Sequence, residues 1–504
     1  MPLRARELSP APGSADVDPR VVLNWRAGRQ AVTHEVYLGS DPNDLSPADV
    51  VTGAPYAAYD TTALDLHLGA TYYWQVNEVN ELEVPAVWEG DVSEFSTRPS
   101  LVVDDFESYT NDAATFSRVF QTWIDGAGYT NPVEVAGNGT GSYIGHDPSL
   151  GDIMETGSVH GGTQSAPLYY GNGGQSVSEV DRTFDEPQDW TRAGVHGLVL
   201  YFYGHSENAP VQLYVKVNNT QVLYDGDMEA LQRMSWQKWY IPLADHLTSS
   251  ELAQVKSLTI GVDGSGGGIL LVDDISLTAD SRNLITPARP TPDNLVAHYA
   301  FDGDTLDSTG AHPATAMGLS NFETGKVGQA ISLAGMFGDY VELTGYKGIL
   351  GSSAITVMAW INTSATETGT IIGWGPATAD GGRFGFRVDD NRIRCEFSGG
   401  NVQGTTTINH GGWQHVAVTV KANATISYPE VTLWVDGVDD TQPSTDETII
   451  NILADDTQDA RIGSRPSAED RWFGGLIDEL YIYDRVLTAE EIAGAAGRSA
   501  PFDQ

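Results

Sequence analysis

The stretch FGGLIDELYIYDRVLTAEEIAG (473–494) decides the fold class and stands near the end of the chain. Within it, Thr488 followed three residues later by Glu491 forms a capping box, which predicts a short terminal helix. Upstream of this stretch, short alternating runs recur about every 8–12 residues, separated by Gly, Asn, Asp and Pro. The pattern predicts an all-β fold.

Two proline-containing joints divide the 504 residues. They are STRPS (96–100) and ITPARPTPDN (285–294), of which the second is a stiff, extended linker by composition. We therefore predict three consecutive β-sandwich modules. The predicted limits are 1–98 for the first module, 99–282 for the middle module, 283–293 for the proline-rich linker and 294–504 for the third module.

The charge balance excludes several classes of partner. The chain has 27 Lys and Arg against 68 Asp and Glu, a net charge of −41. This charge repels nucleic acids and anionic lipids, which both need a basic surface, and it disfavours acidic glycans unless calcium bridges them. The longest apolar runs, such as GLVLYFYG (197–204), are too short to span a bilayer. We expect no nucleic-acid partner and no membrane insertion.

Cysteine usage and the N-terminus bear on the compartment. Cys395 is the only cysteine, so an intrachain disulfide and a cysteine-based metal site are both excluded. The segment MPLRARELSPAPG (1–13) has no apolar export signal, which leaves a cytoplasmic protein or a sequence that starts after a removed signal. The modular β architecture favours the second alternative, and we expect an extracellular or cell-surface protein.

The third module carries several motifs in a fixed order. They are FDG (301–303), DSTG (307–310), VMAWI (357–361), WQHVAV (413–418), LWVDG (433–437) and GLIDELYIY (475–483). In this order they resemble the LamG-like jelly roll of the concanavalin A-like lectin/glucanase superfamily. The resemblance implies a glycan-binding fold, with Trp374, Arg383 and Trp472 as candidate ligand contacts.

The first module has the shortest signals. VVLNWRAG (21–28) and TYYWQVNEVN (71–80) alternate as half-buried strands, and Trp25 is spaced like the core tryptophan of a sandwich. The module resembles a fibronectin type III-like domain. This implies a spacing or docking role without chemistry.

The middle module opens with LVVDDFESY (101–109) and closes with GILLVDDISL (268–277). Between them, an Asp-Trp pair at 189–190 precedes the strand GLVLYFYG, and SWQKWYIPL (235–243) follows. This order resembles the galactose-binding-like jelly rolls of carbohydrate-binding modules, most closely family 11.

Two strands of the middle module place tyrosines on the face opposite the core. In GLVLYFYG, Leu198, Leu200 and Phe202 share the core parity, so Tyr201 and Tyr203 face outward. If VQLYVKV (211–217) pairs with this strand, the outward residues form a platform for the apolar face of a sugar. The alternative is that these tyrosines cover a neighbouring loop or module, in which case the site lies in the loops around Trp123 and Tyr129 or around Trp236. The predicted sugar-binding residues are Tyr201, Tyr203, Gln212, Tyr214, Lys216, Trp236 and Tyr240.

Acidic residues in both jelly rolls suggest structural calcium. Carboxylates from separate strands suit the six to eight oxygen ligands of Ca²⁺, and both resemblances imply such a site. The alternatives are solvated strand-edge charges in the middle module and turn capping by Asp in the third. The predicted ligands are Asp105, Glu107 and Asp273 in the middle module, and Asp302, Asp307 and Asp478 in the third.

Catalytic signatures are missing from the sequence. The paired-carboxylate pattern of concanavalin A-like endoglucanases, E-x-D-x-x-E, is absent; SEVDRTF (178–184) lacks its second glutamate. Enzyme activity stays open, because glycosidase acids can come from distant strands. Our main hypothesis is polysaccharide or glycan binding by tandem β-sandwiches. The alternatives are a polysaccharide-cleaving hydrolase or lyase, and a structural or adhesion protein that binds other extracellular proteins.

Overall fold

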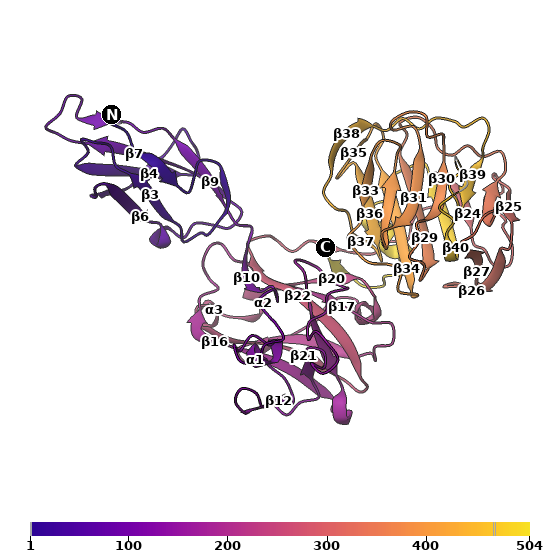
Figure 1. The fold of residues 1–504 in the computed structure, drawn as a ribbon, viewed down its shortest axis with the longest axis horizontal. Coiled ribbons are helices and arrows are strands. Elements are labelled where there is room, and N and C mark those ends of the chain that lie inside the picture. The colour runs from indigo at the N-terminus through magenta and orange to yellow at the C-terminus, as the bar shows by residue number, and fades with distance from the viewer. Residues whose placement is uncertain (1–2, 467, 469) are drawn as a thin grey trace.

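The computed structural model describes residues 3–466, 468 and 470–504. It contains three β-sandwiches in succession, so the predicted all-β fold is confirmed (Figure 1). Each sandwich encloses its own cluster of buried apolar side chains, drawn from residues 23–95, 103–277 and 297–482. No helix in the described part of the chain has the length and apolar character that a bilayer crossing requires.

The first sandwich packs a three-stranded sheet against a six-stranded one around Trp25 and Trp74, which are both 1% exposed. The strands of the smaller sheet are β1 (Arg6–Ser9), β3 (Val22–Arg26) and β6 (Tyr56–Asp60). The larger sheet contains β2 (Ser14–Val17), β9 (Ser93–Thr97), β7 (Thr71–Val79), β4 (Thr33–Gly39) and β5 (Ser46–Val51), with β8 (Val87–Trp88) paired to β7.

The middle sandwich packs an eight-stranded sheet against a five-stranded one. The eight-stranded sheet runs β14 (Tyr143–Ile144), β15 (Ala166–Tyr170), β22 (Gly268–Thr278), β17 (Gly197–Tyr203), β20 (Trp236–Pro242), β41 (Phe502–Asp503) and β23 (Leu284–Ile285), with β10 (Ser100–Asp104) paired to β22. The five-stranded sheet runs β11 (Trp123–Ile124), β16 (Val177–Gln188), β21 (Val255–Asp263), β18 (Gln212–Val217) and β19 (Thr220–Leu223). The remaining elements are the pair β12 (Gly128–Tyr129) and β13 (Val135–Ala136) and the helices α1 (Val119–Thr122), α2 (Leu243–His246) and α3 (Ser249–Leu252).

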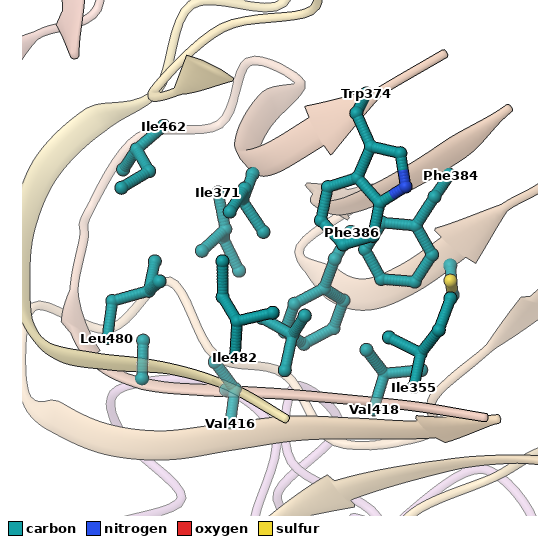
Figure 2. Close-up of a cluster of buried hydrophobic side chains, with 14 of the residues drawn as sticks. Ile355, Ile371, Trp374, Phe384, Phe386, Val416, Val418, Ile462, Leu480 and Ile482 are labelled. Carbon is teal, nitrogen blue, oxygen red and sulfur yellow. The ribbon is translucent and has the colours of Figure 1, made fainter. Parts of the chain in front are cut away.

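The third sandwich is the largest, and aromatic and β-branched side chains fill its core (Figure 2). One sheet runs β26 (Asn321–Thr324), β27 (Gln329–Ala334), β40 (Gly474–Tyr483), β29 (Ile355–Asn362), β34 (Trp413–Val420), β36 (Val431–Val435) and β37 (Val438–Asp439), with β24 (Leu295–Tyr299) paired to β40. The other runs β25 (Ala314–Met317), β28 (Tyr340–Leu343), β39 (Ala460–Ile462), β30 (Gly369–Trp374), β31 (Phe384–Asp389), β32 (Arg392–Glu396) and β33 (Asn401–Gln403). The pair β35 (Thr425–Ser427) and β38 (Thr445–Ile449) and the helix α4 (Ala489–Ala495) complete the module, and Thr488 and Glu491 form the expected capping box at α4.

The end of the chain leaves the third module and joins the middle one, which corrects the predicted limits. β41 pairs with β20 of the middle sheet and with β23, which lies inside the predicted linker. The C-terminus accordingly lies beside β20 in Figure 1. The carboxylate of Asp503 accepts hydrogen bonds from the backbone N–H of Tyr240 at 3.0 Å and from the guanidinium of Arg282. Sequence patterns within each module do not show this pairing, because the partner strands are more than 200 residues apart.

A buried arginine fastens the two jelly rolls together. Arg498 is 4% exposed, and its guanidinium lies 3.8 Å from the centre of the Phe502 ring. Its Nε donates to the backbone carbonyl of Asp436 in the third module at 2.6 Å, and its Nη2 donates to Oε1 of Gln237 in the middle module at 2.7 Å. Burial lowers the pKa of Arg498 to about 9. Ser235 adds a hydrogen bond to the Asp436 carboxylate at 2.8 Å.

We expect the middle and third modules to unfold together because of this contact. Arg498→Ala leaves the Gln237 and Asp436 acceptors buried without a donor, which costs roughly 2 kcal/mol or more. Differential scanning calorimetry should show the shared transition of the two modules split in the variant. Lys421→Ala, which removes an exposed ion pair with Glu430, is the control and should leave the transition whole. Two separate transitions in the unmodified protein would contradict this account.

Candidate functional site

The predicted tyrosine platform is wrong, because its two strands lie in opposite sheets of the middle sandwich. β17 carries Tyr201 and Tyr203 and pairs with β20 and β22. β18 carries Tyr214 and pairs with β19 and β21 in the other sheet. The rings therefore lie on opposite outer faces of the sandwich and cannot contact the same sugar.

A loop and the third module cover the outward face of β17, as the alternative interpretation predicted. The imidazole of His160 stacks on Tyr201, with ring centres 3.5 Å apart. Tyr203 is 7% exposed and packs against Trp236 at 5.5 Å. Tyr203 and Trp236 share a small hollow with Thr405, Thr406 and Thr407 of the third module.

Four other predicted sugar contacts are engaged within the middle module. The Tyr214 hydroxyl and the Lys216 ammonium both contact one carboxylate oxygen of Glu179. The Gln212 side-chain amide donates to two backbone carbonyls, at 2.9 and 3.0 Å. Tyr240 is 4% exposed, and its hydroxyl donates to a backbone carbonyl at 2.9 Å. These groups have a structural role in this arrangement.

The candidate contacts in the third module are also mostly interior. Trp374 is 1% exposed and stacks on Phe384 in the core, as Figure 2 shows. Arg383 is 4% exposed and pairs with Glu396. Trp472 is half-buried, with its ring centre 5.6 Å from that of Phe337.

The acidic residues predicted as calcium ligands in the middle module gather around one loop, residues 160–164. The Glu107 carboxylate accepts from the backbone N–H and the hydroxyl of Thr163, at 2.9 and 2.7 Å. Asp273 accepts from two backbone amides of the loop, at 3.0 and 3.3 Å. Asp274 contacts Nδ1 of His160 at 2.6 Å. Asp105 instead accepts from the Glu107 backbone N–H in a tight turn, at 3.2 Å.

One property of this cluster favours a bound cation, and another speaks against it. Asp273 is fully buried, and burial raises its pKa to about 7, with a further rise from the negative charge of Asp274. The raised pKa means that the negative charge of Asp273 is unfavourable in this place, and a bound proton or cation would neutralise that charge. However, loop donors already occupy oxygens of Glu107 and Asp273, and no group of three or more potential metal ligands was found among the residues that the structure describes.

In the third module, Asp302 and Asp478 converge on the segment 325–329. Oδ2 of Asp478 accepts from the Val327 backbone N–H at 2.9 Å, and Asp302 accepts from the Gln329 N–H at 2.7 Å. Oδ1 of Asp478 is buried and has no hydrogen-bond partner in the described chain, and burial raises the pKa of Asp478 to about 6. An orphaned carboxylate oxygen of this kind suits a cation.

Asp307 has the role that the turn-capping alternative predicted. Its two carboxylate oxygens accept hydrogen bonds from the backbone N–H groups of His298, Thr309, Ala311 and His312 and from the Thr309 hydroxyl. Because these donors engage both oxygens, Asp307 is a turn residue rather than a metal ligand in this arrangement.

A groove of about 740 Å³ opens at the edge of the middle sandwich, beside β14 and β15. We call it the Tyr143 groove, because the ring of Tyr143 lies in its wall and is 47% exposed. Leu150, which is 85% exposed, and the half-buried Phe120 add apolar surface. The remaining lining residues are Asp125, Ala127, Gly128, Ile144, Gly145, His146, Asp147, Pro148, Gly151, Asp152, Tyr169 and Asn172.

Hydrogen bonds fix the polar groups of the Tyr143 groove. Nδ1 of His146 lies 2.7 Å from the Tyr169 hydroxyl, and Nε2 lies 3.3 Å from a carboxylate oxygen of Glu155. The buried Asp125 carboxylate accepts from three backbone amides of the surrounding loops, at 2.8 to 3.1 Å. The groove thus combines an exposed aromatic ring with a prearranged set of polar side chains.

Sequence reasoning came close to the Tyr143 groove but missed its main residues. Trp123, named as a rim candidate, is fully buried and donates its indole N–H to Asp104 at 2.7 Å. Tyr129 packs on Phe120, a groove residue, with ring centres 6.5 Å apart. The signal that could have identified the site is YIGHDPSLGD (143–152), which mixes aromatic, glycine and polar residues outside any long strand.

A larger cleft of about 1060 Å³ lies between the first and middle modules. Charged side chains of both signs line it, among them Arg98, Arg192 and Asp65. Its aromatic residues, Phe184 and Trp190, are 9% and 1% exposed. The cleft therefore lacks an exposed ring on which a sugar could stack, and the Tyr143 groove is the better candidate.

Comparison with known proteins places the third module. Residues 334–493 match the family model of the concanavalin A-like lectin/glucanases superfamily, Laminin_G_3. This confirms the LamG-like prediction over these residues, whereas the fibronectin type III and family 11 resemblances stay predictions. No curated protein matches the chain.

Solved structures align with about two fifths of the chain. Domain 4 of AbnA, a GH43 extracellular arabinanase from Geobacillus stearothermophilus in complex with arabinotriose, is 25% identical, with 40% of this chain and 98% of that chain covered and a TM-score of 0.33. The binding domain of Paraclostridial Mosquitocidal Protein 1 is 16% identical, with 40% and 52% covered and a TM-score of 0.29. The binding domain of botulinum neurotoxin serotype D/C is 13% identical, with 41% and 52% covered and a TM-score of 0.31. The match thus spans about half the length of the two toxin domains.

The raised pKa of Asp273 gives a pH test of the acidic cluster. When a chelator keeps the site free of metal ions, the Asp273 carboxyl is protonated in the folded module up to about pH 7. In the unfolded chain the same carboxyl ionises near pH 4. Its contribution to stability is therefore full below pH 4 and is lost as the pH rises to 7. The unmodified protein should therefore lose a few kcal/mol of unfolding free energy between pH 4 and pH 8 that the Asp273→Asn variant does not lose. The melting temperature of the variant should accordingly fall less over this range. Asp105→Asn is the control, and a variant curve parallel to that of the unmodified protein would refute the assignment.

Proposed function

We propose that this chain binds a glycan chain in the Tyr143 groove. The observation that carries the proposal is the exposed ring of Tyr143 in a 740 Å³ groove that also contains His146 and Asn172. Sugars present an apolar C–H face and a rim of hydroxyls, so an aromatic ring next to polar side chains matches both. The groove's volume of about 740 Å³ leaves room for more than one unit of a neutral polysaccharide.

The state of the acidic residues favours binding over cleavage. A glycosidase needs one carboxyl with a raised pKa as the acid and a second carboxylate facing it. Burial raises the pKa of Asp125, but three backbone amides already hold its carboxylate in the wall of the groove. Asp152 accepts a hydrogen bond from Asn111 at 2.7 Å. The pKa of Asp147 is lowered by hydrogen bonds from Ser149. Among its described residues, the Tyr143 groove therefore has side chains that can bind a sugar but lacks the pair of facing carboxyl groups that a glycosidase uses.

We further propose that the protein works outside the cell with bound calcium. The orphaned oxygen of Asp478, with Asp302 nearby, fits a hard cation, for which backbone carbonyls and water would supply the other ligands. The excess of acidic residues suits a medium rich in calcium. The alternative is adhesion through other extracellular proteins, and a screen that finds no glycan ligand would favour it.

The glycan proposal can be tested with a panel of polysaccharides and the full chain. We expect binding to at least one neutral glucan, mannan or xylan, measured by affinity electrophoresis or calorimetry. Tyr143→Ala should weaken it about fivefold or more, the equivalent of about 1 kcal/mol for one stacked ring, with little change in melting temperature. Tyr56→Ala, which removes a tyrosine 62% exposed in the first module, is the matched control. Binding that does not depend on Tyr143, or no binding to any member of the panel, would overturn the proposal.

Calcium alone provides a separate test. Calcium at a hundredfold excess over its Kd should stabilise the third module by about 2.7 kcal/mol through mass action. Asp478→Asn should abolish this thermal shift, whereas Asp307→Asn should keep it. A melting temperature that responds to neither calcium nor chelator would remove the calcium proposal and leave the glycan proposal standing.

A further inference from the structure

A second hollow, of about 200 Å³, lies where the middle and third modules meet. The middle module supplies Tyr203, the half-buried indole of Trp236 and the loop 156–163. The third module supplies Arg392, at the start of β32, and the threonines at 405–407. We call this hollow the inter-module pocket.

Hydrogen bonds hold both walls of the inter-module pocket in place. The carboxylates of Glu107, Asp273 and Asp274 fasten the loop of the middle module at its residues 160–163. On the opposite wall, the hydroxyls of Thr405 and Thr406 donate to the Asp440 carboxylate at 2.7 and 2.6 Å. The contact through Arg498 fixes the two modules relative to each other. The pocket is thus preformed rather than assembled on binding.

The residues that line the inter-module pocket carry one positive charge, although carboxylates such as Glu107 and Asp440 lie behind its walls. The net charge of the chain is −41, yet the described residues that line the pocket include one arginine and no aspartate or glutamate. The side chain of Arg392 makes no hydrogen bond or ion pair with any described residue. Arg394, two residues along the same strand, is paired with Asp389 at 2.8 Å. A half-buried arginine that pairs with no acidic residue in the described part of the chain is a ready site for a carboxylate.

The other lining groups narrow the ligand to a sugar. The rings of Trp236 and Tyr203 provide apolar surface. Because Thr405 and Thr406 donate their hydroxyl protons to Asp440, their oxygens can accept hydrogen bonds from the hydroxyls of a sugar. Because one water molecule occupies about 30 Å³, a hollow of 200 Å³ holds the volume of about seven waters. That is room for one sugar unit rather than for a chain of them. We infer that the inter-module pocket binds one uronic acid unit, with its carboxylate on the guanidinium of Arg392. This site is separate from the Tyr143 groove and does not rest on the function proposed for it.

The test uses the full chain with D-galacturonate and D-glucuronate, compared with D-galactose, D-glucose and acetate. Titrations followed by ligand-observed NMR should show at least one uronate binding tenfold more tightly than its neutral hexose and than acetate. Added salt should weaken this binding, because it depends on an ion pair. Equal binding of uronate and hexose would overturn the inference, as would acetate binding as tightly as the uronates.

Variants locate the effect in the pocket. Arg392→Gln should remove the tenfold preference for uronate, and Arg392→Lys should keep part of it, because a charge remains without the planar fork. Arg394→Gln is the matched control on the same strand and should keep the preference in full. An Arg392→Gln variant that folds and keeps the preference, or an equal loss in Arg394→Gln, would refute the site. Tyr143→Ala should leave uronate binding unchanged, so failure here and failure of the Tyr143 groove are distinguishable.

Discussion

The contact that the architecture depends on is the return of the C-terminal segment to the middle module. β41 lies beside β20, and the guanidinium of Arg498 bridges a side chain of one module and a backbone carbonyl of the other. Without this segment, β20 would expose an unpaired strand edge, which is a site for unwanted association. Trp236 is the first residue of β20, and it lines the inter-module pocket together with residues of the third module.

The abundant acidic residues act mainly as acceptors that hold loops in place. Glu107 follows β10 and Asp273 lies in the middle of β22, the strand that pairs with β10, and both accept hydrogen bonds from the loop at 160–164. Asp125 performs the same task in the wall of the Tyr143 groove. Rigid loops reduce the entropy lost when a ligand binds. The two hollows are therefore defined by carboxylates that need not touch a ligand at all.

Local patterns predicted the core well and the surfaces poorly, for a physical reason. The parity of Leu198, Leu200 and Phe202 in β17 follows from the period of two in a strand, and all three are buried as expected. Parity cannot show which strands are neighbours, so a platform shared by Tyr203 and Tyr214 depended on a pairing of their strands, and these lie in different sheets.

The burial of Trp374 and the exposure of Tyr143 were equally hidden from local patterns. Both depend on long-range pairing and on loop paths. The LamG-like prediction succeeded because it rested on several motifs in order across the third module, and the family model covers most of that range.

The claim on which the rest depends is that the middle and third modules form one body through the C-terminal strand. Hydrogen–deuterium exchange of the full chain tests it directly, because the Gln504 N–H donates to the Asn283 carbonyl at 3.0 Å and β41 pairs with β20 and β23. We expect residues 502–504 to exchange as slowly as β20. Exchange as fast as that of the exposed loop at Leu82 and Val84 would show that the segment is not docked. The inter-module pocket would then have no fixed geometry, and the account would be contradicted.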